Sequence, residues 1–258
     1  PRRGAIVTSF RVRGRELLYM EESTLTDPDK NVRGGVPVLF PSPGKLDGDA
    51  WTRDGHNGAM KQHGFARNLP WNVTEGAAGR AASVTLSLAS SDATLVQYPW
   101  EFRAELTFSL TGARLRIGLR VTNASSSPMP FGVGFHPYFA VKDKARAKID
   151  TRATRAFDNV TKTVMPFAGF DLTAKEVDLH LLDHGSTESA LHFGDGSRVG
   201  VRGSSDYGRW VVWTLAGKDF VCLEPWTCPG NALNSGEGLT IVRPEQSHES
   251  WVEIEFMA

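Results

Sequence analysis

The stretch Phe102-Arg-Ala-Glu-Leu-Thr-Phe-Ser-Leu110 alternates apolar and polar residues over its whole length. A period of two is the repeat of a β-strand that has one face on a core and the other toward water. The stretch from Arg114 to Val121 continues the same alternation, and Thr111-Gly112 between the two is typical of a turn. Together they predict an antiparallel pair of half-buried strands.

The alternation returns on both sides of this pair, at Val84 to Leu88 and again at Val252 to Phe256. Ala174 to Asp183 is compatible with a helix or a strand, and the alternation of its apolar residues favours a strand. No segment keeps the apolar repeat of an amphipathic helix. Many short strands with turn residues between them predict an all-β fold, either a sandwich or a barrel.

The chain of 258 residues shows no internal repeat and no low-complexity linker, so we expect one domain over residues 1–258. The longest loop-like tract, Asn31 to Asn57, runs toward His63, and long loops in compact domains are often functional. The chain begins at Pro1 without a methionine, so we expect it to be trimmed at its N-terminus, and a lost leader cannot be judged.

Composition restricts the classes of partner. Lys+Arg and Asp+Glu both number 29, which argues against nucleic acid or an anionic membrane as a partner. No apolar run approaches the length of a membrane span. Cys222 and Cys228 are the only cysteines, and we expect two reduced thiols in a cytoplasmic protein, although a local bridge stays open.

Glu224 is the first candidate for chemistry. It follows the apolar run Phe220-Val-Cys-Leu223 and precedes Pro225-Trp226. A carboxylate at the end of a buried strand and beside an indole is partly desolvated, which raises its pKa from about 4.3 toward the range of a general base. The alternative is a structural ion pair or a solvated loop acid.

Two histidines lie in Gly/Phe-rich contexts. His136 stands in Phe131-Gly-Val-Gly-Phe-His-Pro-Tyr-Phe139, where glycines allow a close approach of the backbone to a ligand. His63 and Arg67 frame His63-Gly-Phe-Ala-Arg67, and both side chains can donate to ligand hydroxyls. The alternatives are a core histidine bonded to backbone, a loop that binds its own carbonyls, and a surface arginine.

Other candidates are weaker. Asp178 is suited to orient a polar ligand, whereas acids in alternating strands are usually solvated. Trp71, Trp226 and Phe139 are suited to stack on a sugar face, whereas aromatic residues more often pack in a core. His180 and His184 have a metal-binding spacing but lie in an expected strand, so we expect no metal site.

Taken together, the motifs resemble those of the aldose 1-epimerase (galactose mutarotase) family, in the same order and over nearly the whole chain. The residues that carry the resemblance are Arg33-Gly-Gly35, Phe40-Pro41, His63-Gly-Phe-Ala-Arg67, Pro70-Trp71, His136-Pro-Tyr-Phe139, Glu224-Pro-Trp226, Pro229-Gly-Asn231 and Pro244-Glu-Gln-Ser247. The resemblance implies a large antiparallel β-sandwich with a sugar-binding cleft on one sheet. It also implies a cytoplasmic protein that needs neither metal nor cofactor, present as a monomer or a dimer.

The resemblance further implies a mechanism, the interconversion of α and β anomers by ring opening. Glu224 matches the general base of the family and His136 the general acid. Reference pKa values of about 4.3 and 6.5 suit that division near neutrality. The matches for sugar binding are His63, Arg67, Arg33, Asp178 and Trp226.

The sugar itself stays open between a free hexose, which the Phe40-Pro-Ser-Pro-Gly-Lys-Leu46 tract favours, and a hexose 6-phosphate held by Arg33 and Arg67. Two alternative functions are compatible with the same fold. A non-catalytic sugar-binding module needs no paired acid and base. A glycoside hydrolase normally needs two carboxylates flanking the bond, and Glu224 has no strong partner except Asp178.

Overall fold

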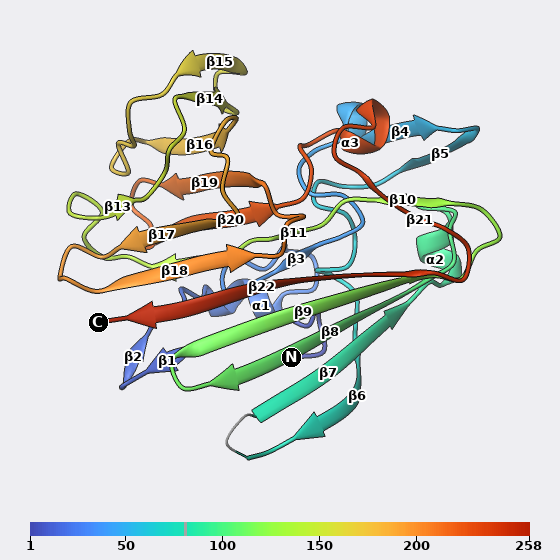
Figure 1. Ribbon diagram of the computed structural model, residues 1–258, viewed down its shortest axis with the longest axis horizontal. Helices are drawn as coiled ribbons and strands as arrows, with labels where there is room; N and C mark the ends of the chain where they lie inside the picture. The colour runs from blue at the N-terminus through green and yellow to red at the C-terminus, as the bar shows by residue number, and fades with distance from the viewer. Residues whose placement is uncertain (80–81) are drawn as a thin grey trace.

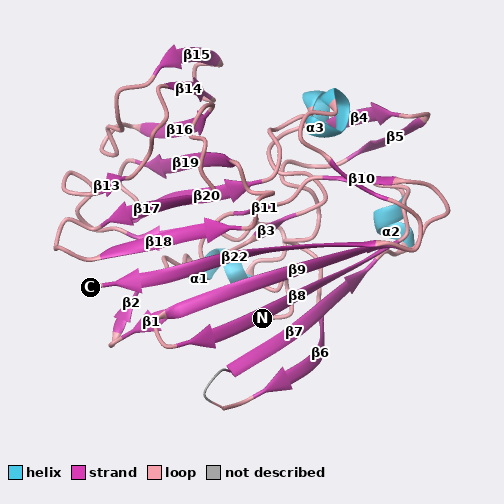
Figure 2. Cartoon of the chain, in the orientation of Figure 1, coloured by secondary structure: helices cyan, strands magenta, loops and turns pink. Residues whose placement is uncertain are grey.

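The computed structural model describes residues 1–79 and 82–258, and almost all of its regular structure is β (Figure 1; Figure 2). The helical segments that it describes are single short turns: α1 (Glu22–Thr26), η1 (Asp47–Asp49), α2 (Asp92–Leu95) and α3 (Ala232–Ser235). The all-β prediction is therefore confirmed.

The first large sheet has eight antiparallel strands and contains the strand pair predicted from the alternation. Phe102 pairs with Asn123 and Thr111 with Arg114, so the two stretches form one hairpin. The order in the sheet is β13 (Lys148–Ile149), β17 (Glu188–His192), β18 (Arg198–Gly203), β22 (Ser247–Met257), β9 (Arg114–Asn123), β8 (Phe102–Thr111), β7 (Ala82–Ala89) and β6 (Asn72–Ala77).

The second large sheet also has eight strands, and the strand predicted within Ala174 to Asp183 is present as β16. Its order is β15 (Thr163–Pro166), β14 (Arg155–Asp158), β16 (Glu176–Leu181), β19 (Arg209–Leu215), β20 (Phe220–Trp226), β11 (Gly134–Phe135) and β3 (Val38–Leu39). An additional short strand, β12 (Tyr138–Ala140), also pairs with β20.

Three two-stranded ribbons complete the fold: β1 (Arg11–Val12) with β2 (Arg15–Glu16), β4 (Ala50–Arg53) with β5 (His56–Ala59), and β10 (Met129–Phe131) with β21 (Thr240–Val242). The tract Asn31 to Asn57 is thus less irregular than expected, because it contains β3, η1 and β4 and reaches into β5. Trp51 explains the ribbon there, since its buried ring stacks on Trp100 at 5.6 Å between centroids.

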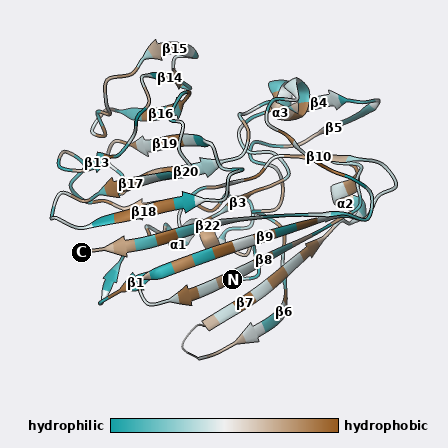
Figure 3. Ribbon diagram, viewed as in Figure 1, coloured by the Kyte–Doolittle hydropathy of each residue, from teal (hydrophilic) through white to brown (hydrophobic). Residues whose placement is uncertain are grey.

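One hydrophobic core lies between the two large sheets. Leu106 and Ile117 of the first sheet and Val212 and Leu223 of the second belong to the same buried cluster. Polar and apolar residues alternate in bands along β18 and β9 (Figure 3), as expected of strands that have one face on this core. The other face of the second sheet is therefore free to build a site.

Candidate active site

A cavity of about 1120 Å³ opens on the face of the second sheet that is turned away from the core. Strands β16, β19 and β20, which lie side by side in Figure 1, supply its floor. The seven residues predicted for the site all line this cavity: Arg33, His63, Arg67, His136, Asp178, Glu224 and Trp226. The fold therefore brings these residues, which are distant in the sequence, together around one cavity.

Strand register explains why the side chains converge. Directly paired residues of antiparallel strands point to the same face of a sheet. Val211 pairs with Glu224 and with His180, and Trp213 pairs with Asp178. Neighbouring residues of a strand point to opposite faces of the sheet. Because Leu223 points into the core, Glu224 points into the cavity.

The floor of the cavity carries a carboxyl–imidazole pair. His136 Nε2 lies 3.3 Å from Glu224 Oε1, and the side chains are only 8% and 2% exposed. Glu224 Oε2 accepts a hydrogen bond of 3.1 Å from Trp226 Nε1. Both carboxyl oxygens therefore have a partner, which fixes the plane of the group.

Aromatic rings hold His136 in place. The Tyr138 ring stacks on the imidazole at 4.6 Å between centroids and 11° between planes. The rings of His63 and Trp213 each meet it edge-on at 5.7 Å. The imidazole Nδ1 is buried and has no hydrogen-bond partner among the described residues, so Nε2, toward Glu224, is the nitrogen positioned for proton transfer.

Burial shifts the two pKa values of the pair in opposite directions. Loss of solvent raises the pKa of Glu224 well above its usual value, and the charge of Asp178 adds to the rise. Burial, assisted by the Arg67 charge, lowers the pKa of His136 to about 3. The order of the two pKa values is thus the reverse of that expected from reference values, so a proton shared by the pair favours Glu224 over His136.

His63 enters the cavity from a tight turn. Its φ of 71° is left-handed, and it is followed by Gly64, where a Cβ atom would lie 2.3 Å from the Phe40 carbonyl oxygen. His63 Nδ1 accepts a hydrogen bond from the Gly44 N–H (3.0 Å), and burial lowers the pKa of the ring well below its usual value. The imidazole is therefore neutral with its proton on Nε2, and this nitrogen lies 3.2 Å from the Gln62 side-chain amide at the cavity wall.

Arg67 brings a buried positive charge to the cavity. It is 9% exposed, and its Nη2 donates to the Gln62 carbonyl oxygen at 2.9 Å. It forms no salt bridge within residues 1–79 and 82–258, and its Nε has no hydrogen-bond partner there. Buried charges are usually paired, so this guanidinium is available to a polar ligand. Arg33 lies at the exposed rim of the same cavity.

Asp178 belongs to a small polar network on the opposite side of the cavity floor. Its Oδ2 accepts a hydrogen bond of 2.7 Å from Asn159 Nδ2, and its Oδ1 lies 3.5 Å from His180 Nε2. The His180 ring in turn meets the Trp226 indole edge-on at 5.2 Å. Trp226 thus contacts Glu224 and His180 at once.

Tyr138, Asn159, His180 and Trp213 are among the cavity residues that the sequence analysis did not assign to the sugar site. His180 had a usable signal, since alternation in β16 places it on the same face as Asp178. Two aromatic candidates were wrong. Trp71 and Phe139 are fully buried in the core, and Trp71 Nε1 donates to the Ala66 carbonyl oxygen at 3.0 Å rather than facing the cavity.

The two cysteines are buried and free, as expected of reduced thiols. In the part of the chain that the structure describes, no helix has the length and apolar character needed to cross a membrane.

The protein is thus an antiparallel β-sandwich with a polar cavity on one sheet, floored by a buried carboxyl–imidazole pair. The sequence model of the family described as aldose 1-epimerase matches residues 1–255. The chain belongs to the aldose 1-epimerase family.

Known proteins agree with this placement. The crystal structure of the Slr1438 protein from Synechocystis sp. PCC 6803 superimposes with a TM-score of 0.96 at 38% identity, covering 99% of this chain and 89% of that one. Galactose 1-epimerase from Lactobacillus acidophilus shares the fold, with a TM-score of 0.79 at 15% identity over 99% of this chain and 89% of that one.

Among curated relatives, a putative glucose-6-phosphate 1-epimerase of Cenchrus ciliaris is 27% identical over 168 residues, or 61% of this chain. That match covers 48% of the Cenchrus ciliaris protein, so the chain spans about half the length of that relative.

Proposed function

We propose that the protein is a mutarotase that interconverts the α and β anomers of an aldohexose. The observation that carries this proposal is the buried His136–Glu224 pair, 3.3 Å apart on the floor of a cavity large enough for a sugar. Anomer exchange requires a base at the C1 hydroxyl and an acid at the ring oxygen. A pair that shares one proton supplies both groups.

In the proposed reaction Glu224 takes the proton of the C1 hydroxyl while His136 donates one to the ring oxygen. The C1–ring oxygen bond breaks, C1 becomes an aldehyde carbon, and rotation about C1–C2 followed by the reverse transfers gives the other anomer. The raised pKa of Glu224 makes its carboxylate a stronger base, and the lowered pKa of His136 makes its imidazolium a stronger acid. Burial thus favours both transfers once the working proton arrangement forms.

The remaining residues are proposed to hold the sugar. Neutral His63 donates from Nε2, Arg67 donates to hydroxyl oxygens, and Asp178 accepts from hydroxyls. Trp226 offers apolar surface to the sugar ring in addition to its bond to Glu224. No step needs a metal or a cofactor, because side chains carry both protons.

A phosphorylated hexose is the second candidate substrate. Arg67 forms no salt bridge within the described residues, and Arg33 at the rim has no side-chain hydrogen bond there. Guanidinium groups of this kind suit phosphate, and a curated relative bears the name putative glucose-6-phosphate 1-epimerase. We favour the free hexose because proton transfer by the pair does not depend on a phosphate.

The test is the rate of anomer exchange for glucose, galactose and glucose 6-phosphate, measured by polarimetry and NMR exchange spectroscopy. We expect acceleration over the spontaneous rate for at least one sugar. Arg33→Ala is expected to raise KM for glucose 6-phosphate and to leave glucose unchanged if phosphate reaches the rim. A folded protein that accelerates none of the three sugars would overturn the proposal.

A further inference from the structure

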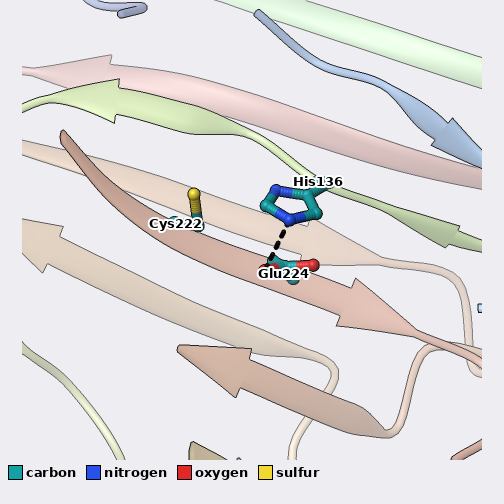
Figure 4. A group of neighbouring side chains, drawn as sticks. All are labelled: His136, Cys222 and Glu224. Carbon is teal, nitrogen blue, oxygen red and sulfur yellow. Dashed lines mark ion pairs between the residues drawn. The ribbon is translucent and has the colours of Figure 1, made fainter. Parts of the chain in front are cut away.

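A third donor group adjoins the acid–base pair. Cys222 precedes Glu224 by two residues on β20, so its side chain lies on the same face of the strand (Figure 4). One donor atom each of His136, Cys222 and Glu224 lies within 4.8 Å of the others, and all three residues are buried. No other group of three such donors is found in residues 1–79 and 82–258.

The donor set matches the preferences of zinc. Imidazole nitrogen, thiolate sulfur and carboxylate oxygen are its usual ligands, and three protein ligands with an open fourth position form a tetrahedral site. His136 Nε2 and Glu224 Oε1 are 3.3 Å apart. Two ligands at about 2.0–2.1 Å from a tetrahedral ion are separated by about that distance. The Cys222 sulfur lies within 4.8 Å of a donor atom of each partner, so a tetrahedral set requires it to move toward the pair.

Charge and access also favour an ion at this position. A thiolate and a carboxylate together neutralise a divalent cation, so the occupied site carries no net charge in its buried surroundings. The thiol gives up its proton when the metal–sulfur bond forms. His136 and Glu224 both line the cavity, which gives the ion a path of entry and leaves the fourth position to water.

The inner side of the site is closed by apolar groups. Cys222 packs in a buried cluster with Tyr138 and Phe220, against which the Trp213 ring also rests. These side chains keep the Cys222 sulfur away from water and near His136 and Glu224. Arg67 opposes a cation, but its single charge is smaller than the two negative charges of the ligands.

We propose that His136, Cys222 and Glu224 form an inhibitory binding site for a thiophilic divalent cation such as Zn²⁺. The ion occupies the carboxylate oxygen and the imidazole nitrogen that face each other, so neither group can exchange a proton with a sugar. Binding stands on the donor geometry alone, whereas inhibition rests on the proposed mutarotase function. The reaction itself uses no metal, and the site is a means of stopping it.

Binding is tested with Co²⁺, whose bond to a thiolate gives a charge-transfer absorption in the near ultraviolet. We expect this absorption in the wild-type protein and in Cys228→Ala, which removes the other buried cysteine. We expect its loss in Cys222→Ala and in the more isosteric Cys222→Ser. Absence of the absorption in the wild type, or its persistence in folded Cys222 variants, would overturn the site. This result does not depend on any enzymatic activity.

Inhibition is tested by adding Zn²⁺ during anomer exchange. Cys222→Ala is expected to keep the basal rate and to raise the inhibitory Zn²⁺ concentration at least about 100-fold, because even outer-shell partners of a metal are worth about 10–100-fold in affinity. Cys228→Ala is expected to be inhibited like the wild type. Equal inhibition of Cys222→Ala would place the ion elsewhere, for example at Asp178 and His180, and would contradict the proposal.

Discussion

Glu224 and His136 face each other in surroundings that favour neither the carboxylate nor the imidazolium. The carboxyl group is 1% exposed and the histidine 6%. Loss of solvent therefore raises one pKa and lowers the other, so that the pair is uncharged when it holds a single proton, on Glu224. In the proposed reaction the pair is active only while its two groups hold one proton between them, so its protonation state determines the pH range of activity.

This requirement gives a pH dependence with a definite sign. Below the lowered pKa of His136, about 3, the pair holds two protons and has no base. Above the raised pKa of Glu224 it holds none and has no acid. We expect kcat/KM, corrected for spontaneous exchange, to stay level between the two pKa values as far as the fold persists, and to fall as the pH rises through the raised pKa of Glu224.

Circular dichroism at each pH provides the control for folding in that experiment. Half-loss of activity on the acid side near pH 6.5, with the fold intact, would show that the pair takes up its second proton near neutrality and does not behave as described. The sequence could not predict this order of pKa values. It depends on burial by Tyr138 of the same segment and by His63 and Trp213, which reach the pair from other segments of the chain.

At the scale of elements, β20 is the strand on which the site depends, and its neighbour β11 fits closely against it. Gly134 of β11 pairs with Trp226, and a Cβ atom on Gly134 would lie 2.6 Å from the indole Cδ1. A side chain there displaces the ring whose Nε1 donates to Glu224. The absence of a side chain at Gly134 therefore lets the Trp226 indole stay in place and hold the Glu224 carboxyl group by its hydrogen bond.

We expect Gly134→Ala to lower the free energy of unfolding by about 1–3 kcal/mol through overpacking, and to lower kcat more than it changes KM. Urea denaturation and the rate of anomer exchange measure the two effects. Gly118→Ala on β9 is the matched control, because its nearest neighbour, the Thr107 carbonyl oxygen, is 3.8 Å from the added Cβ atom. Wild-type kinetics in a stable Gly134→Ala protein would show that the indole does not orient Glu224.

The strands themselves were largely predictable, since alternation located β7, β8, β9, β16 and β22. The end of β20 was not. Pro225 lies inside this strand, opposite Trp210, although a proline lacks the N–H of a ladder bond and is usually kept out of central strands. The apolar run therefore predicted a strand that ended before Glu224, whereas the structure continues it to Trp226.

At the scale of the whole molecule, the cavity is assembled from segments separated by up to two hundred residues, from Arg33 at the rim to Glu237. The order of motifs allowed the set of site residues to be predicted through a family resemblance. Distances could not be predicted, because they follow from strand register and from the packing of one sheet on the other. The same limit explains Trp71 and Phe139, whose apolar character fits a core and a sugar platform equally well.

The central claim is that Glu224 acts as the base for anomer exchange, and Glu224→Gln tests it most directly. Glutamine keeps the size of the side chain and an oxygen that accepts from Trp226 Nε1, and removes only the basicity. Glu249→Gln, an exposed position on β22, is the matched control.

The measurement is the rate of α-to-β exchange by NMR exchange spectroscopy on the sugar that the wild-type protein accelerates most. We predict that Glu224→Gln loses about 10²–10⁴ of the enzymatic rate while its unfolding transition remains cooperative, and that Glu249→Gln matches the wild type. A folded Glu224→Gln protein that retains the wild-type rate would contradict the account.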